Sequence, residues 1–119
     1  MLTAGQVTSD NLAADIKPFI KGSAVSAGTG GAVVDSFDGS VYRTAKFIIQ
    51  VDNGAGEYES REALVTHNGT SAFITEYAIV YTGAGLLGDA SVQMNGSTVE
   101  LVYSAASGTA SVTVTGTYL

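Results

Sequence analysis

The stretch from Glu62 to Thr82, EALVTHNGTSAFITEYAIVYT, constrains the fold more than any other part of this sequence. It predicts two β-strands that are joined through His67-Asn68-Gly69-Thr70, with an Asn-Gly pair at the centre of the turn. Asn-Gly is the strongest short-range hairpin signal, because both residues tolerate the positive φ angles of a two-residue turn. The second strand is largely apolar on both faces, so we expect it in the centre of a sheet.

The rest of the chain repeats the same pattern of short strands and tight turns. Residues 41–52 alternate between apolar and polar side chains, apart from Arg43, and residues 57–67 return with a polar, exposed beginning and a buried end at Ala63-Leu64-Val65. Further strands are predicted over residues 33–37, 90–94, 97–104 and 109–118. About seven or eight strands at this spacing, without a long helix, indicate an all-β antiparallel sandwich or barrel, of which we favour the sandwich.

The first part of the chain has a different character. Residues 8–10, Thr-Ser-Asp, are typical of a cap on a short helix that Pro18 limits, and Gly22–Gly31 is typical of a flexible joint. We therefore divide the chain into an N-terminal arm and linker (residues 1–31) and a β-sandwich domain (residues 32–119). The arm lies on its own domain or reaches a neighbour, and the sequence leaves both open. Its apolar residues are the predicted assembly contacts: Leu12, Ile16, Phe19 and Ile20.

Composition excludes several classes of function. A net charge of −6 with only five basic residues argues against a nucleic-acid partner, since such a surface needs clustered Lys and Arg. The absence of cysteine excludes a disulfide framework and a thiolate metal site. The start, MLTAGQVTSD, lacks the features of a signal peptide, and no apolar run approaches the roughly 20 residues of a membrane span. We expect a protein without membrane contact that is made in a cytoplasm.

Two features invite a chemical interpretation. The histidine, His67, occupies the first position of a predicted turn, where it would be exposed and lack an orienting partner for general-base catalysis. The acidic residues around the turn at 53–56 offer oxygen ligands for Ca²⁺, but their spacing matches no calcium loop and Arg61 neutralises part of the charge. A solvated strand face is the favoured interpretation for these four residues: Asp52, Glu57, Glu59 and Glu62.

The six tyrosines are a third such feature. Aromatic faces stack on sugar rings, but tyrosines that are spread over several strands are more often core or interface residues whose hydroxyl reaches the rim. The sequence therefore predicts no enzyme, no cofactor and no metal site.

Two stretches carry a resemblance to a known group of proteins. Val41–Val51 (VYRTAKFIIQV) and Glu62–Gly83 (EALVTHNGTSAFITEYAIVYTG) resemble a β-rich module of structural proteins in tailed bacteriophages, especially phages of cyanobacteria and other marine bacteria. The N-terminal TSDNLAADI is similar to short segments near the beginnings of phage fibre and appendage proteins.

The resemblance implies a non-enzymatic virion structural protein that is made in the host cytoplasm. The module stands almost alone behind its arm, without the long shaft segments of a fibre. We therefore expect a capsid decoration (cement) protein that binds the shell formed by the major capsid protein and neighbouring copies of itself. Self-association is implied, with a trimer as one candidate form. The alternatives are a tail-fibre or appendage protein, a receptor-binding module for carbohydrates, and a cellular carbohydrate-binding module.

Overall fold

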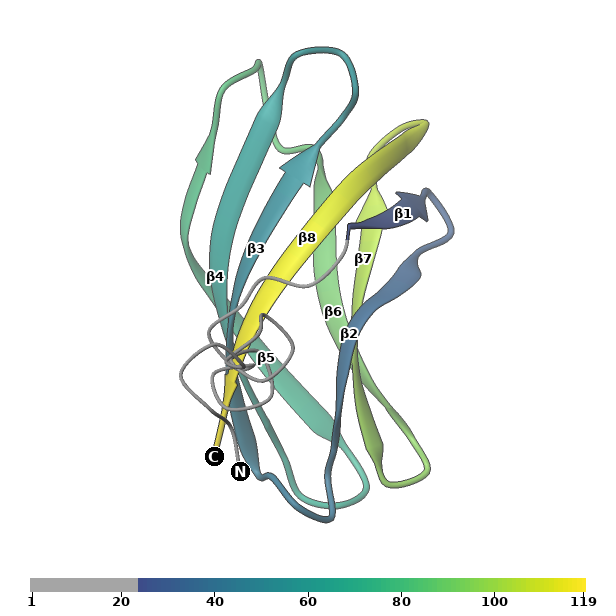
Figure 1. Ribbon diagram of the computed structural model, residues 1–119, viewed down its shortest axis with the longest axis vertical. Helices are drawn as coiled ribbons and strands as arrows, with labels where there is room; N and C mark the ends of the chain where they lie inside the picture. Colours follow the sequence, from purple (N-terminus) through teal and green to yellow (C-terminus); the bar gives the residue numbers. More distant parts are fainter. Residues whose placement is uncertain (1–23) are drawn as a thin grey trace, which may run out of the picture.

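The computed structural model describes residues 24–119, which form two antiparallel sheets (Figure 1). The larger sheet has the strand order β1-β8-β3-β4-β5, and the smaller has the order β2-β7-β6. This arrangement confirms the predicted all-β sandwich. The described residues contain no helix that could span a membrane. The strands are β1 (Val25–Gly28), β2 (Ala32–Asp38), β3 (Thr44–Asp52), β4 (Tyr58–His67), β5 (Ala72–Tyr81), β6 (Gly88–Asn95), β7 (Thr98–Ala105) and β8 (Thr109–Tyr118).

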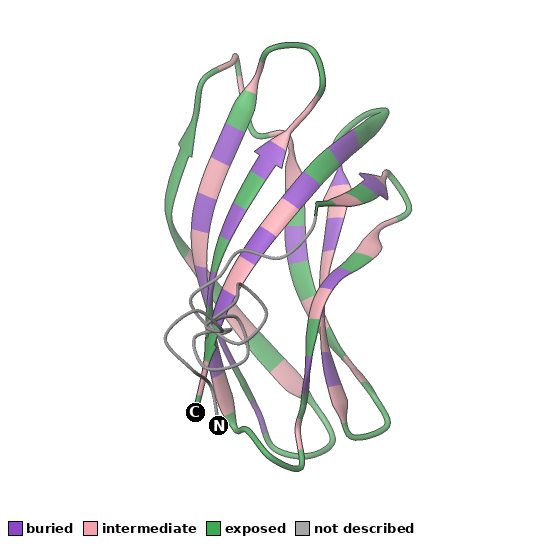
Figure 2. Ribbon diagram, in the orientation of Figure 1, coloured by how far each residue is buried: buried purple, intermediate pink, exposed green. Residues whose placement is uncertain are grey.

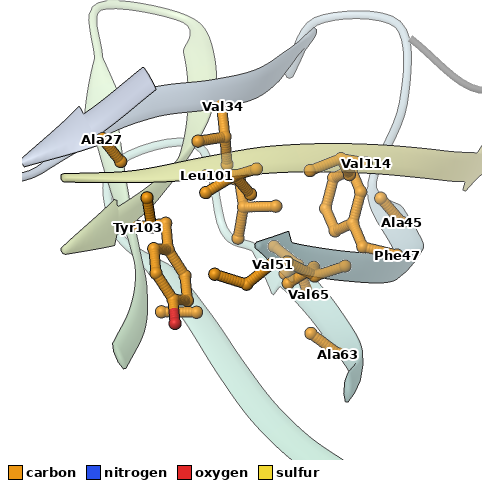
Figure 3. Packing of buried hydrophobic residues seen from close by; sticks show 14 of the residues in the cluster. Ala27, Val34, Ala45, Phe47, Val51, Ala63, Val65, Leu101, Tyr103 and Val114 are labelled. Carbon is orange, nitrogen blue, oxygen red and sulfur yellow. The ribbon is translucent and has the colours of Figure 1, made fainter. Parts of the chain in front are cut away.

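The core lies between the two sheets and follows the period-two alternation of the sequence. In β3, every second residue from Ala45 to Val51 is buried, while the residues between them face outward (Figure 2). Figure 3 shows side chains from β3 and β4 meeting Leu101 and Tyr103 of β7 in the space between the sheets. Burial of a large apolar side chain contributes about 1.5–3 kcal/mol, so this alternation is what holds the layers together.

Strand β1 corrects the interpretation of Gly22–Gly31 as a flexible joint. Residues 25–28 pair with residues 109–112 of β8, and Ala27 is fully buried against the core. A run of small residues fits a flexible linker, but it fits equally a short strand whose small side chains allow close packing. Residues 1–23, including the predicted helix and its cap, lie outside the described residues.

The hairpin between β4 and β5 is present, but its turn differs from the predicted two-residue form. Four residues, Asn68–Ser71, connect the strands, and Gly69 alone among them has a positive φ, of 95°. The Asn68 side chain stabilises this longer turn. Its Oδ1 accepts hydrogen bonds from Thr70 N at 3.0 Å and from Ser71 N at 2.8 Å. Asparagine therefore acts here through its side chain and not through a positive φ.

The positive φ of Gly69 gives a direct test of this hairpin. We expect Gly69→Val to lower the free energy of unfolding by about 1–3 kcal/mol, because a β-branched residue is strained at this backbone conformation. Gly30→Val is the control, since no positive φ is found there and an added Cβ would meet nothing within 4 Å. Urea unfolding of both variants measures the difference, and equal losses would contradict the assigned turn.

The expectation of a central position for the second strand of this hairpin is wrong. Strand β5 is the last strand of the larger sheet, and none of its residues is buried (Figures 1 and 2). A strand with apolar residues on both faces gives the same sequence pattern whether a second layer covers it or leaves it at the surface. The sequence shows which residues share a face, but it does not show what lies above that face.

Candidate functional site at strand β5

A buried ionic cluster lies beneath β5, between the two sheets. Glu59 and Arg61 are on the inward face of β4, and each is only 1% exposed. Arg61 Nε and Nη2 donate to Glu59 Oε1 at 3.1 and 2.6 Å. Arg61 Nη1 donates to Glu76 of β5, and Nη2 also donates to the main-chain oxygen of Gly88 in β6 at 3.0 Å. One guanidinium therefore connects three strands.

Groups from the smaller sheet and a loop complete the cluster around Glu59. The Tyr103 hydroxyl on β7 donates to Glu59 Oε1 at 2.9 Å, and Leu87 N donates to Glu59 Oε2 at 2.8 Å. The Tyr103 ring also lies below the Arg61 guanidinium, 5.6 Å from its carbon. In the described part of the chain, no buried side-chain nitrogen or oxygen lacks a partner. The charged groups of the cluster therefore satisfy one another. Through Arg61, they also connect β5 of the larger sheet to β6 of the smaller sheet.

Hydrogen bonding keeps Arg61 ionised. Burial alone would lower the pKa of Arg61, because it disfavours the charged form. The hydrogen bonds to Glu59 and Glu76 outweigh that effect and raise the pKa of Arg61 above its ordinary value. Arg61 is therefore a cation in the folded protein at neutral pH.

The acidic residues around the turn at 53–56 do not converge on one site. Asp52 Oδ1 accepts from Gly54 N at 2.8 Å, and Glu57 Oε1 accepts from Asn53 Nδ2 at 2.9 Å. Glu59 points inward, whereas Glu62 points outward to Lys46 at 3.2 Å. Residues 24–119 hold no group of three or more side chains that could bind a metal ion.

The interpretation of this acidic group as a solvated strand face is wrong for Glu59. Arg61 follows two residues later and points to the same side, so the two charges are buried together as a pair. The sequence carries a signal for this arrangement. Glu59 and Arg61 alternate along β4 on the same face as Ala63 and Val65, which are fully buried. If the alternation of buried and exposed residues is applied to the whole of β4, it predicts that both charged side chains face the core.

His67 was expected to be exposed and without an orienting partner, and it is neither. It is the last inward residue of β4 and is 4% exposed. Its Nε2 lies 2.8 Å from the main-chain oxygen of Tyr42, and its Nδ1 accepts from Gly69 N at 3.0 Å. These bonds require a neutral ring that carries its proton on Nε2. With both nitrogens engaged, His67 holds the hairpin loop in place.

The tyrosines divide into two groups. Tyr103 and Tyr118 lie between the sheets, and Tyr118 donates to Asp35 Oδ2 at 2.8 Å while it packs edge-on against Phe47. The other four are between 39% and 48% exposed: Tyr42, Tyr58, Tyr77 and Tyr81. The expected role as core or interface residues is therefore confirmed for the first pair, which packs in or against the core, and for the exposed group an interface role stays a prediction.

Alkaline pH should destabilise the protein through the two inner tyrosines. Burial, followed by the hydrogen bond to a carboxylate, raises the pKa of both Tyr103 and Tyr118 above the ordinary value of about 10. The stabilisation that follows is complete below pH of about 10, the unfolded value, and is lost as the pH rises further. Urea unfolding at a series of alkaline pH values measures this loss. Tyr118→Phe should flatten the dependence, and an unchanged pH dependence in that variant would contradict the assignment.

A hollow lies where three loops meet at one end of the sandwich. Its volume is about 190 Å³, and residues such as Asn53, Glu57 and Leu86 line it. Leu87 packs against the core, whereas Leu86 is 48% exposed. The hollow is small for a sugar ring with its contacts, and none of the exposed tyrosines lines it.

The outer face of the larger sheet carries exposed apolar side chains that were not predicted there from the sequence. Leu64, which was expected to be buried, is 43% exposed, and Phe73 is 57% exposed. The strand register places both on the side of the sheet that faces away from the core. We call this surface the outer apolar patch, and it consists of Ile48, Leu64, Phe73, Tyr77 and Val80. Exposed apolar groups that cluster in this way mark an interaction surface.

The predicted assembly contacts are not part of this patch. Leu12, Ile16, Phe19 and Ile20 lie outside the described residues, so their role stays a prediction. Reasoning from the sequence missed the patch because it assigned apolar strand residues to the core.

Comparison with known proteins gives a likeness of fold. No protein-family model matches the sequence, and no curated protein matches it. A solved structure, the tailspike protein of Acinetobacter phage vB_ApiP_P1, superposes on 84% of this chain with a TM-score of 0.51 and 17% sequence identity. The chain spans 22% of the length of that tailspike. At this identity the likeness shows a shared fold, and the fold is one that occurs as a β-module within a phage tailspike.

Proposed function

We propose that this chain is a non-enzymatic structural β-module of a tailed-phage virion, located in a tail appendage. The observation that carries the proposal is the shared fold with a phage tailspike over 84% of the chain. The resemblance of residues 41–51 and 62–83 to phage structural modules supports the same class independently. An appendage position is favoured over a capsid position because the structural likeness is to a tail protein.

The arrangement of the polar residues supports a structural role. His67 uses both ring nitrogens to hold a loop. The buried charged groups of Glu59 and Arg61 form hydrogen bonds with each other and with their neighbours. A catalytic group needs a free lone pair or proton within reach of a substrate. The lone pairs and protons of Glu59, Arg61 and His67 are already engaged in hydrogen bonds within the protein.

Capsid decoration is the second candidate, and the outer apolar patch is compatible with it. A decoration protein strengthens a shell by burying surface against the major capsid protein and against neighbouring copies, and symmetry multiplies each contact. An exposed sheet face with apolar side chains suits such lateral packing. The same patch suits contacts within an appendage, so the patch alone does not separate the two positions.

Labelling of purified virions tests both positions. An antibody against the chain, coupled to gold, should mark the tail of particles of the phage that encodes it. Label on the head would instead support capsid decoration and overturn the appendage position. Binding of the purified chain to a panel of host surface glycans would add a receptor-binding role. Absence of the chain from purified virions would overturn the virion function altogether.

A further inference from the structure

Strand β5 provides one of the four strand edges in the described sandwich, and its first six residues are free of the irregularity that interrupts the strand further on. Natural sheets protect their edges with short strands, bulges, Pro or charged residues. At the opposite edge of the larger sheet, β1 has only four residues. In the smaller sheet, β2 has a register shift and carries Asp35 and Asp38, and β6 carries Asp89.

By contrast, the first six residues of β5, AFITEY, form a regular and exposed strand. Their single charge, Glu76, is turned inward to Arg61. The irregularity of β5 comes after Tyr77, where Ala78 has a φ of 51°. Residues 72–77 therefore offer a straight strand to any partner, and no described strand occupies that side.

The hydrogen-bond pattern identifies which main-chain groups of this edge are free. His67 N donates to Arg43 O on the side of β3, so alternate residues of β4, such as Thr66 and Leu64, face β5. Their partners in the register are Phe73 and Thr75, whose main-chain groups consequently face β4. The groups that point away from the sheet belong to the intervening residues: Ala72, Ile74 and Glu76.

We propose that β5 pairs with β5 of a second copy of this chain, antiparallel and with the two-fold axis at Thr75. In this register Ile74 lies opposite Glu76 of the other copy, and the two exchange main-chain hydrogen bonds. Phe73 lies opposite Tyr77 in a non-hydrogen-bonded pair, where Cα atoms are only about 4.5 Å apart. Symmetry repeats this aromatic pair, and such cross-strand pairs stabilise a sheet.

Other self-pairings of the same strand are less favourable. A two-fold axis at Glu76 would place two glutamates directly opposite, and like charges in that position are destabilising. An axis at Ile74 would place Phe73 opposite Thr75 and Tyr77 opposite the loop residue Ser71, so the aromatic pair would be lost. In a register shifted by one residue, a residue with free main-chain groups, such as Ile74, would lie opposite a residue of the other copy whose main-chain groups already bond to β4, such as Thr75. The axis at Thr75 combines the hydrogen-bonded pair of Ile74 and Glu76 with the aromatic pair of Phe73 and Tyr77.

A second copy also fits the surface that surrounds the edge. The pairing would join two five-stranded sheets into one, so that the outer apolar patches of both copies form a continuous surface. The Glu76 carboxylates would face the same side of the joined sheet, but each is already paired with Arg61. This inference rests on the proposed virion function, since the resemblance to phage structural modules implies self-association, and it names the surface that carries it.

A cysteine at the axis gives the sharpest test, because the chain has no cysteine of its own. Thr75 is exposed, and in the proposed pair its Cα lies opposite that of its symmetry mate at a distance that a disulfide can bridge. Oxidised Thr75→Cys should run on a non-reducing gel at twice the 12.1 kDa mass of the chain. Ser111→Cys is the matched control, an exposed position on the outer face of β8, and it should remain monomeric.

Charge substitution at the same position tests the pairing in solution. Sedimentation of the full chain should show a dimer, and Thr75→Lys should weaken it at least about tenfold because two lysines then lie directly opposite. A mixture of Thr75→Lys and Thr75→Glu should restore the dimer, and Ser111→Lys should leave it unchanged.

Each of three results would overturn the proposal: a monomeric full chain, a trimer that is insensitive to both charges at Thr75, or a Thr75→Cys variant that crosslinks no better than Ser111→Cys. These measurements use the purified chain without virions. Their failure would therefore leave the virion function to be decided by gold labelling.

Discussion

Replacement of Arg61 by methionine is expected to lower the free energy of unfolding by about 3–5 kcal/mol, which is a large fraction of the stability of a domain of this size. The guanidinium is 1% exposed and is the cationic partner of Glu59 and of Glu76. Methionine fills much of the same volume, so the loss would come mainly from the carboxylates that remain buried without their counter-ion. The midpoint of urea unfolding measures the effect.

Two controls separate this explanation from a simple loss of packing. A triple variant in which Arg61→Met is combined with Glu59→Gln and Glu76→Gln removes all three charges, and it should recover most of the lost stability. Lys46→Met breaks the exposed ion pair with Glu62 on the other face of the sheet, and it should leave the unfolding midpoint nearly unchanged. If the triple variant were as unstable as Arg61→Met, unpaired charge would not be the cause.

The sequence predicted the sandwich because alternation and turn residues are local properties. The alternation from Ala45 to Val51 identified the inward face of β3, and the strands that were predicted over residues 90–94 and 97–104 correspond to β6 and β7. Both signals depend on neighbouring residues only, so they are visible without knowledge of the fold.

The errors concern properties that depend on residues far apart in the chain. The edge position of β5 follows from the order in which strands pair, and that order is set by contacts such as those between β3 and β8. The burial of Glu59 likewise depends on Tyr103, which lies 44 residues away on the other sheet. A local pattern shows that Glu59 and Arg61 share a face, but it does not show that a second sheet supplies the hydroxyl that makes their burial tolerable.

Gly88→Ala is also expected to lower the free energy of unfolding, because it disturbs the same cluster from the side of β6. A Cβ at this position would collide with the main-chain oxygen of Ser104 on the neighbouring strand, and it would lie 2.6 Å from the Tyr103 hydroxyl. The main chain of β7 is fixed by pairing on both sides, so Ser104 has little freedom to move. Tyr103 could move away only by leaving its hydrogen bond to Glu59.

We therefore expect Gly88→Ala to cost about 1–3 kcal/mol, as overpacking of a filled interior does. Gly85→Ala is the matched control, since a Cβ there would meet nothing within 4 Å, and it should leave the unfolding midpoint nearly unchanged. A spectroscopic alkaline titration gives a second readout, because Tyr103 should lose part of the burial that raises its pKa. A destabilised variant in which the tyrosine titration is unaltered would show that β6 moved and that Tyr103 stayed. Equal stability of the two alanine variants would contradict the close approach of β6 to this cluster.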